Sequence, residues 1–157
     1  EYGFNSIYLL PVNLYGPGDN FHPETSHVIP ALIKKCINAR DSGADHIECW
    51  GTGSASREFL YVKDAAKAII LATETYNKAE PVNIGNGHEV PIRTLVQAIA
   101  NLTGFKGEIR WNSNYPDGQP RRCLDTTRAR QEFGFQAITG LEDGLRETIE
   151  WYERNKP

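Results

Sequence analysis

The stretch PVNLYGPGDNFHPETSH, residues 11–27, most strongly limits what this chain can fold into. Its two glycines, three prolines, two histidines, two asparagines and one aspartate make a conformationally restricted, hydrogen-bonding loop. An apolar run at residues 6–11 predicts a buried strand before it. Helical spacing predicts a helix after it, from Ile29, Leu32, Ile33, Cys36 and Ile37. Such a loop is a common place for a site, and a plain surface connection has the same composition.

The rest of the chain alternates strand patterns with amphipathic helix patterns. We predict strands at residues 46–50, 57–62, 82–84 and 108–111, helices at 63–76 and 92–102, and two further helices at the end. The segment REFLYV has apolar residues on both faces, which predicts a strand covered on both sides. Ser26 is predicted to cap the first helix, and Thr139 with Glu142 forms a capping box before the last. A partial GxG at residues 51–53 lacks a following helix, so we reject a dinucleotide fingerprint there.

These patterns predict an α/β protein: the last strand of an incomplete Rossmann-type domain, followed by a small mixed α/β substrate-binding domain. We place residues 1–18 in the first domain and residues 19–157 in the second, with elements of the second that can return to the first. The chain contains no methionine. We interpret it as a piece of a longer polypeptide whose other part lies mostly upstream, and a processed mature protein is the alternative.

Charge and cysteine content narrow the class of function. A net charge of −3 gives no general attraction to nucleic acids or membranes, and no apolar run approaches the roughly 20 residues that span a bilayer. Three scattered cysteines without CxxC spacing suit neither a disulfide framework nor a zinc site, which favours a cytoplasmic protein without a metal. Residues 105–130 contain six basic and three acidic residues. Such a local basic cluster favours a small anionic ligand.

Four segments, in this order, resemble the carboxyl-terminal half of the GDP-L-fucose synthases, a family of extended short-chain dehydrogenases: PVNLYGPGDNFHPETSHVIPALI, WGTGSASREFLYVKD, NIGNG and PDGQPRRCLDTTR. RxFxYVxD and NIG are shared more widely among enzymes acting on nucleotide sugars. DNFHPETSHVIPAL, WGTGxxxREF and PDGxPR are much more specific to the fucose synthases. The resemblance implies conversion of GDP-4-keto-6-deoxy-mannose to GDP-L-fucose, by epimerisation at C3 and C5 and reduction of C4 with NADPH.

The resemblance also implies roles around the first loop. His27 matches the acid that reprotonates the sugar carbon, in contact with the cofactor. Histidine titrates near neutral pH and can return a proton to a carbanion beside a ketone. The alternative is a histidine that only begins a helix, and His22 is predicted to be structural. The segment against the nicotinamide end of NADPH (NADP) is matched by Pro11, Val12, Asn13 and Leu14.

Five residues match substrate contacts of the family: Lys35, Trp50, Arg57, Asp117 and Arg122. Lys35 matches a basic contact. A guanidinium forks onto phosphate oxygens, so Arg57 and Arg122 suit the diphosphate. Trp50 can pack on sugar or base, and a core tryptophan is the alternative. Asp117 matches a contact to substrate hydroxyls, and a pure turn role for Asp-Gly is the alternative.

The chain has neither a GxxGxxG loop nor a Tyr-xxx-Lys pair, which in the family lie upstream of the matched segments with a serine and a cysteine base. We predict that the chain alone neither binds NADPH well nor turns over. The alternatives are another NAD(P)-dependent nucleotide-sugar epimerase or dehydratase and, outside enzymes, a non-catalytic nucleotide-sugar binding module. A homodimer is predicted for the full-length enzyme through helices of the other half, and none for this chain.

Overall fold

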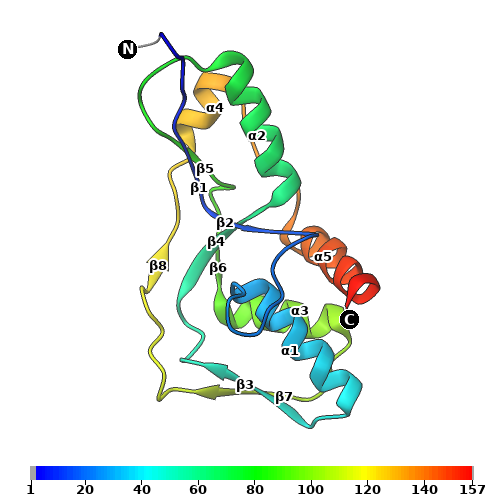
Figure 1. Ribbon diagram of the computed structural model, residues 1–157. Helices are drawn as coiled ribbons and strands as arrows, with labels where there is room; N and C mark the ends of the chain where they lie inside the picture. Colours follow the sequence, from blue (N-terminus) through cyan, green and yellow to red (C-terminus); the bar gives the residue numbers. More distant parts are fainter. Residues whose placement is uncertain (1–2, 157) are drawn as a thin grey trace.

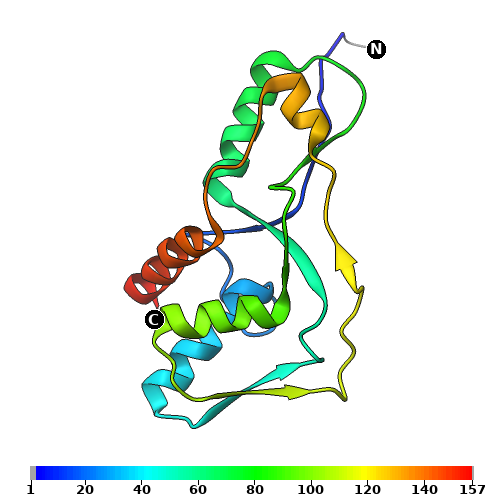
Figure 2. The same ribbon diagram turned by 180° about the vertical axis from the view of Figure 1, so that it is seen from behind.

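The computed structural model describes residues 3–156, which form an elongated α/β molecule with two hydrophobic clusters (Figure 1). In Figure 1 the upper cluster lies beside α2 and α4, and the lower cluster lies among α1, α3 and α5. The view from behind shows the same two parts, with one long strand among the several segments that run between them (Figure 2). That strand is β4 (Ser56–Tyr61).

The upper cluster is built on two parallel strands and two helices: β1 (Leu9–Pro11), β5 (Val82–Ile84), α2 (Val62–Thr75) and α4 (Thr127–Phe133). The strand predicted at residues 6–11 forms only over Leu9–Pro11, and the prediction that it is buried is wrong, because Leu10 and Pro11 are exposed. Within residues 3–156, β1 pairs with β5 along one edge and its other edge is open. A strand with an open edge leaves backbone N–H and C=O groups without a strand partner.

The lower cluster is built on three helices and two parallel strands: α1 (Val28–Ser42), α3 (Ile92–Thr103), α5 (Leu141–Asn155), β3 (His46–Trp50) and β7 (Glu108–Asn112). The apolar stripe predicted for the first helix is buried from Ile29 to Ile37, which confirms that helix. It ends at Gly43, whose φ of 67° is the left-handed conformation that glycine adopts without strain.

Strand β4 joins the two clusters. It pairs in parallel with β2 (Asn13–Tyr15) and β8 (Arg121–Arg122), and antiparallel with β6 (Glu89–Pro91). Phe59 and Tyr61 pack in the lower cluster and Leu60 packs in the upper one. The predicted two-sided cover is therefore confirmed. Because its partners come from distant parts of the sequence, β4 brings the first loop and the late basic segment together.

Two predicted helix caps are wrong. The N-cap residue of α1 is His27, and the backbone N–H of Ser26 instead donates to the carbonyl of His22 at 3.0 Å. The last helix begins after Gly140, one residue later than a capping box at Thr139 requires. The backbone N–H of Thr139 donates instead to the buried Asp64 carboxylate at 2.9 Å, so a tertiary contact holds this entry to α5.

The predicted fold class is confirmed, since parallel strands are covered by helices in a mixed α/β arrangement. The domain boundary after residue 18 stays a prediction. The short strands β6 and β8 have no pattern of their own in the sequence, because both take their pairing from β4.

Candidate functional site

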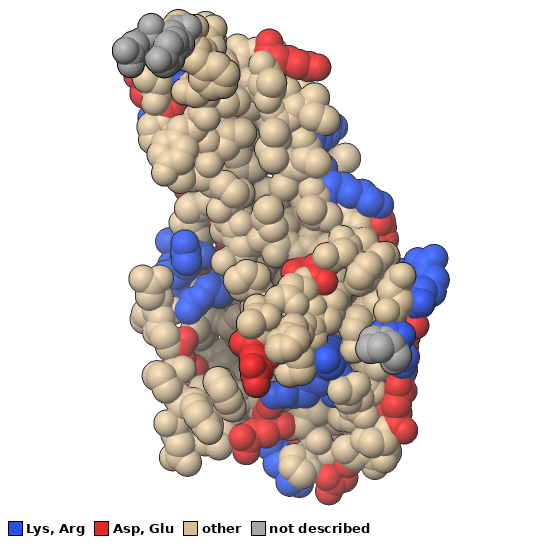
Figure 3. All heavy atoms as spheres, viewed as in Figure 1, with Lys and Arg blue, Asp and Glu red and all other residues tan. Residues whose placement is uncertain are grey.

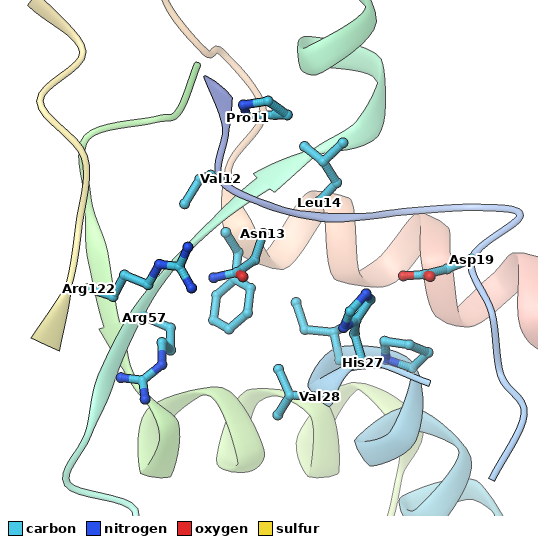
Figure 4. Close-up of a pocket in the computed structure, with 12 residues that line it drawn as sticks. Pro11, Val12, Asn13, Leu14, Asp19, His27, Val28, Arg57 and Arg122 are labelled. Carbon is cyan, nitrogen blue, oxygen red and sulfur yellow. The ribbon is translucent and has the colours of Figure 1, made fainter. Parts of the chain in front are cut away.

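A cavity of about 570 Å³ opens where the first strands, β4 and the start of α1 meet (Figure 4). Many of the residues singled out in the sequence line it. The lining consists of Pro11, Val12, Asn13, Leu14, Asp19, His27, Val28, Ile29, Pro30, Arg57, Phe59 and Arg122. The predicted cofactor segment, the predicted acid and the predicted phosphate-binding arginines therefore share one cavity.

The wall formed by residues 11–14 is firmly anchored. The backbone N–H of Val12 donates to the carbonyl of Ile84 at 2.9 Å, and the Asn13 side chain donates to the carbonyl of Glu58 at 3.0 Å. Val12 is buried, whereas Pro11 and Leu14 are exposed. This wall offers a largely apolar edge in a fixed position.

His27 lies at the end of the first loop, where the chain enters α1. Hydrogen bonds within the loop hold the backbone that leads to His27. The Asn20 side chain donates to the hydroxyl of Thr25 at 2.9 Å and accepts a hydrogen bond from the backbone N–H of His22, also at 2.9 Å. The ring of His22 accepts the backbone N–H of Glu24 at 3.3 Å, which agrees with the structural role predicted for it. The His27 side chain makes no capping hydrogen bond and lines the cavity.

The two arginines of the cavity lie side by side, because β4 and β8 pair with Arg57 opposite Arg122. Arg57 donates to the carbonyls of Ser56 and Gln119, at 2.7 and 2.6 Å, which holds its guanidinium in place. Figure 3 shows basic side chains gathered over β8, beside a hollow in the surface. Two adjacent guanidiniums at a cavity wall suit a ligand with phosphate groups.

Arg121 has a different environment. Its guanidinium pairs with Glu89 at 2.9 Å, and it does not line the cavity. The Arg121 guanidinium and the Ser56 hydroxyl hold the pKa of the Glu89 carboxyl below its usual range. Arg121 is thus engaged in a surface ion pair, while Arg122 is directed to the cavity (Figure 4).

Glu58 is a functional neighbour that the sequence does not reveal. It is 0% exposed, and its two carboxylate oxygens accept the backbone N–H groups of Gly87, at 2.8 Å, and Leu124, at 2.7 Å. It therefore ties the NIGNG turn and the chain after β8 to β4, directly behind the arginines. The REF pattern suggests only a charged residue on a strand, and its burial depends on contacts from far along the chain.

A second, shallower cavity of about 230 Å³ adjoins the first, and Val28 and Arg57 line both. Trp50 lines the second cavity and is 66% exposed, so the alternative of a core tryptophan is wrong. Its ring stacks on Tyr115, with ring centroids 4.4 Å apart and planes inclined by 11°. Nothing in the sequence singles out Tyr115 as a site residue except its position in a restricted loop.

Asp117 also lines the second cavity, and its carboxylate braces the turn after Trp50. Oδ1 accepts the backbone N–H of Thr52 and Oδ2 accepts its hydroxyl, both at 2.7 Å. These bonds from Thr52 lower the pKa of the Asp117 carboxyl. Asp117 therefore has the turn role given as the alternative, and its contact with a substrate stays a prediction.

Lys35 is not among the residues that line either cavity. Its ammonium donates to the carbonyl of Glu48 at 2.7 Å, joining α1 to β3. Its substrate contact stays a prediction. Within residues 3–156, no group of three or more metal-ligating side chains is gathered, and no helix has the length and apolar character needed to cross a bilayer.

The fold and cavity together define the class as an α/β protein with a cationic pocket beside its strands. The chain belongs to the NAD dependent epimerase/dehydratase family, whose sequence profile matches residues 1–85. This agrees with the interpretation of the fold as part of a Rossmann-type arrangement.

Comparison with known proteins shows which members of this family the chain resembles. The chain is 46% identical over 155 residues to "Probable GDP-L-fucose synthase 1" of Oryza sativa subsp. japonica, covering 99% of this chain and 47% of the rice protein. It is 41% identical over 165 residues to "GDP-L-fucose synthase" of Escherichia coli (strain K12), covering 99% and 51%. A gdp-l-fucose synthetase from Naegleria fowleri bound to NADP matches with a TM-score of 0.88 and 31% identity, covering 95% and 47%. The chain thus spans about half the length of these relatives.

Proposed function

We propose that this chain is the substrate-binding half of an NADPH-dependent GDP-L-fucose synthase, which converts GDP-4-keto-6-deoxy-mannose to GDP-L-fucose. The observation that carries the proposal is the 570 Å³ cavity, in which an anchored strand edge, a histidine and two arginines meet. The likeness to GDP-L-fucose synthases over 99% of the chain supports it.

The arginines bind the diphosphate of the substrate. Arg57 and Arg122 lie opposite one another on paired strands, so one phosphate-bearing ligand can reach both. Charge-assisted hydrogen bonds from guanidinium to phosphate are among the stronger polar contacts in proteins. This pair anchors the nucleotide end and directs the sugar toward His27.

His27 is the acid of the epimerisation. A base in the half of the protein outside this chain takes a proton from a carbon beside the C4 ketone, which leaves a carbanion stabilised as an enolate. The His27 imidazolium then donates an N–H proton to that carbon from the opposite face, and neutral imidazole remains. The restricted loop and the helix start fix the ring at the cavity wall, where the sugar would lie.

The fixed edge formed by residues 11–14 fits the nicotinamide end of NADPH. Its exposed apolar side chains, Pro11 and Leu14, can cover a planar ring, and the anchored backbone holds them in place. His27 lines the same cavity and would contact cofactor and sugar together. When bound, NADPH supplies the hydride that reduces the C4 ketone. The other contacts belong to the half of the protein outside this chain, so the isolated chain is expected to bind NADPH weakly and not to turn over.

The second cavity extends the substrate site. The exposed face of Trp50, held by Tyr115, offers a platform for a sugar or base. Asp117 retains acceptor capacity for a substrate hydroxyl beyond its bonds to the turn. Lys35 would contact the substrate only after its ammonium gives up the hydrogen bond to the Glu48 carbonyl. Its role is therefore the least supported of the five substrate contacts. A cytoplasmic location and a homodimer of the full-length protein complete the proposal.

Titration of the purified chain with GDP, and with UDP as the comparison, tests this function through tryptophan fluorescence. We expect saturable binding that prefers GDP. Arg57→Ala should weaken GDP binding by about tenfold, because a charged hydrogen bond to phosphate is lost. Arg110→Ala is the matched control: Arg110 lies on β7, pairs with Glu108 at 2.8 Å and lines neither cavity.

Each other outcome has a distinct meaning. Equal binding of UDP and GDP would favour another nucleotide-sugar epimerase or dehydratase of the same family. Absence of nucleotide binding by a chain shown to be folded would contradict the proposed substrate site. GDP binding by this chain, with no fucose synthesis by the full-length protein, would favour the non-catalytic binding module.

A further inference from the structure

Asp19 has an unexplained side chain in the main cavity. Its backbone N–H donates to the carbonyl of Gly16 at 3.2 Å, and its Oδ1 accepts the backbone N–H of Asn20 at 2.7 Å, so the residue is held in a turn. Its other oxygen, Oδ2, is buried and has no hydrogen-bond partner within residues 3–156. A buried carboxylate oxygen without a partner is costly, which indicates that it serves another group.

The histidine that lines the same cavity is His27. Both residues line the 570 Å³ cavity, and Figure 4 shows the Asp19 carboxylate directed from the first loop toward the imidazole. The imidazole makes no capping hydrogen bond to α1, so its N–H groups remain available to the cavity. A carboxylate is a good acceptor for an imidazolium N–H.

The charges around the cavity explain why a carboxylate beside His27 would help the reaction. The charged groups that line it are Asp19 from the first loop, Arg57 from β4 and Arg122 from β8. Two guanidiniums at one cavity wall disfavour a further positive charge beside them. Asp19 is the acidic residue among the lining groups, and its negative charge offsets theirs. An acid that must donate a proton near neutral pH needs such a counter-charge.

We propose that Asp19 is a positioning residue for His27: its carboxylate accepts one ring N–H of the imidazolium and directs the other toward the reacting sugar carbon. When that second N–H proton moves to the carbon, His27 becomes neutral and Asp19 stays ionised, so charge and protons balance. The assignment of the step rests on the function proposed above. The pairing of the two side chains does not, and it can be measured without substrate.

The test is an NMR titration of the histidine rings in this chain. We expect Asp19→Asn to lower the titration midpoint of His27 by about one pH unit, because a neutral amide no longer favours the imidazolium. Arg122→Gln should raise the same midpoint, since it removes a like charge. Opposite shifts from two cavity variants would show that charge, rather than a general change of fold, sets the midpoint.

A second aspartate–histidine pair in the chain provides the matched control. Asp45 contacts His46 at 2.6 Å on the surface, and 83% of the Asp45 side chain is accessible to solvent. Asp45→Asn should shift His46 and leave His27 unchanged. An unchanged His27 midpoint in Asp19→Asn, with the amide spectrum otherwise that of the parent chain, would overturn the proposal.

A measurement without any substitution covers the case in which Asp19→Asn does not fold. In the parent chain, the carboxyl carbon of Asp19 should show an inflection at the midpoint of His27, because paired groups sense each other's charge; its absence would overturn the pairing. Loss of GDP binding by the parent chain would contradict the proposed function, whereas an unresponsive His27 contradicts only this inference.

Discussion

The two hydrophobic clusters of this molecule differ in how completely they are covered. The lower cluster is enclosed by α1, α3 and α5 with β3 and β7. The upper cluster has helices on one side and, beside β1, an apolar groove of about 370 Å³. Ile69 of α2 lines this groove and is 52% exposed, and Ile70 on the same helix is 58% exposed. Apolar area left in water contributes no stabilisation, so the lower region is the more self-sufficient of the two.

The sequence of α2 explains the difference. Buried alanines lie on one face, and the exposed isoleucines lie on others. A helix that is apolar around most of its circumference is typical of a helix covered on more than one side. The lower helices have a single apolar face and a polar remainder, which suits the enclosed cluster that they form. The cavity lies between a closed region and an open one.

The largest expected effect comes from truncating the lower core. Ile33 is fully buried, and Ile33→Ala should lower the free energy of unfolding by about 4 kcal/mol. Ile84, equally buried in the upper cluster, lines the open groove, so Ile84→Ala should cost about 2 kcal/mol because water can reach the space. Urea denaturation of both variants measures this. Equal losses would remove the distinction between the clusters.

Glu58→Gln tests the strand that joins the two regions. The amide can accept only one of the two backbone N–H groups that Glu58 now accepts, and its NH₂ group would face the other. We expect a loss of about 2 kcal/mol in urea denaturation, because a buried donor stays unsatisfied. Glu48→Gln, at an exposed position of β3, should change stability by less than about 0.5 kcal/mol. Equal effects would contradict a bridging role for Glu58.

Gly144→Ala sets helix propensity against packing in the lower region. Alanine is favoured in a helix by about 1 kcal/mol. An added Cβ would, however, clash with the Tyr15 hydroxyl and lie 3.0 Å from the Tyr61 ring. Overpacking a closed core costs about 1–3 kcal/mol, so a net loss of about 1 kcal/mol is expected in thermal denaturation. A gain in stability would mean that the side chains around Gly144 rearrange to make room for the methyl group at little cost.

The smallest effect concerns the contact between α5 and the start of α2. The Lys63 ammonium and the Tyr61 hydroxyl, which both donate to Glu147, lower the pKa of its carboxyl. The stabilisation is therefore complete above the ordinary glutamate pKa of about 4.3 and fades as pH falls through the lowered value. Glu147→Gln should have a slightly lower Tm than the parent chain at neutral pH, and this difference should vanish in acid. A difference independent of pH would exclude the ion pair as its cause.

Much of the local structure follows from the sequence. Apolar spacing predicts α1 through Ile29 and Ile33, and REFLYV predicts a strand covered on both faces, because these patterns depend on neighbours a few residues away. The resemblance of the motifs to a known family places residues 11–14, His27, Arg57 and Arg122 in one site, and all of them line one cavity. The cap at Ser26 fails because the loop folds into a local turn at His22 and the helix begins one residue later, after His27. The cap at Thr139 fails because its backbone N–H donates to Asp64, 75 positions away.

What the sequence by itself determined is the order of helices and strands, the restricted first loop and the residue types available for anion binding and proton transfer. Only the tertiary structure decided that Glu58 is buried, that Trp50 is exposed and stacked on Tyr115, and that Asp19 lines the same cavity as His27. The physical reason is the range of the interactions. Periodicity and turn propensity act within a few residues, whereas Glu58 receives its hydrogen bond from Leu124, 66 positions away. Such partners become neighbours only when β4 pairs with strands from distant parts of the chain.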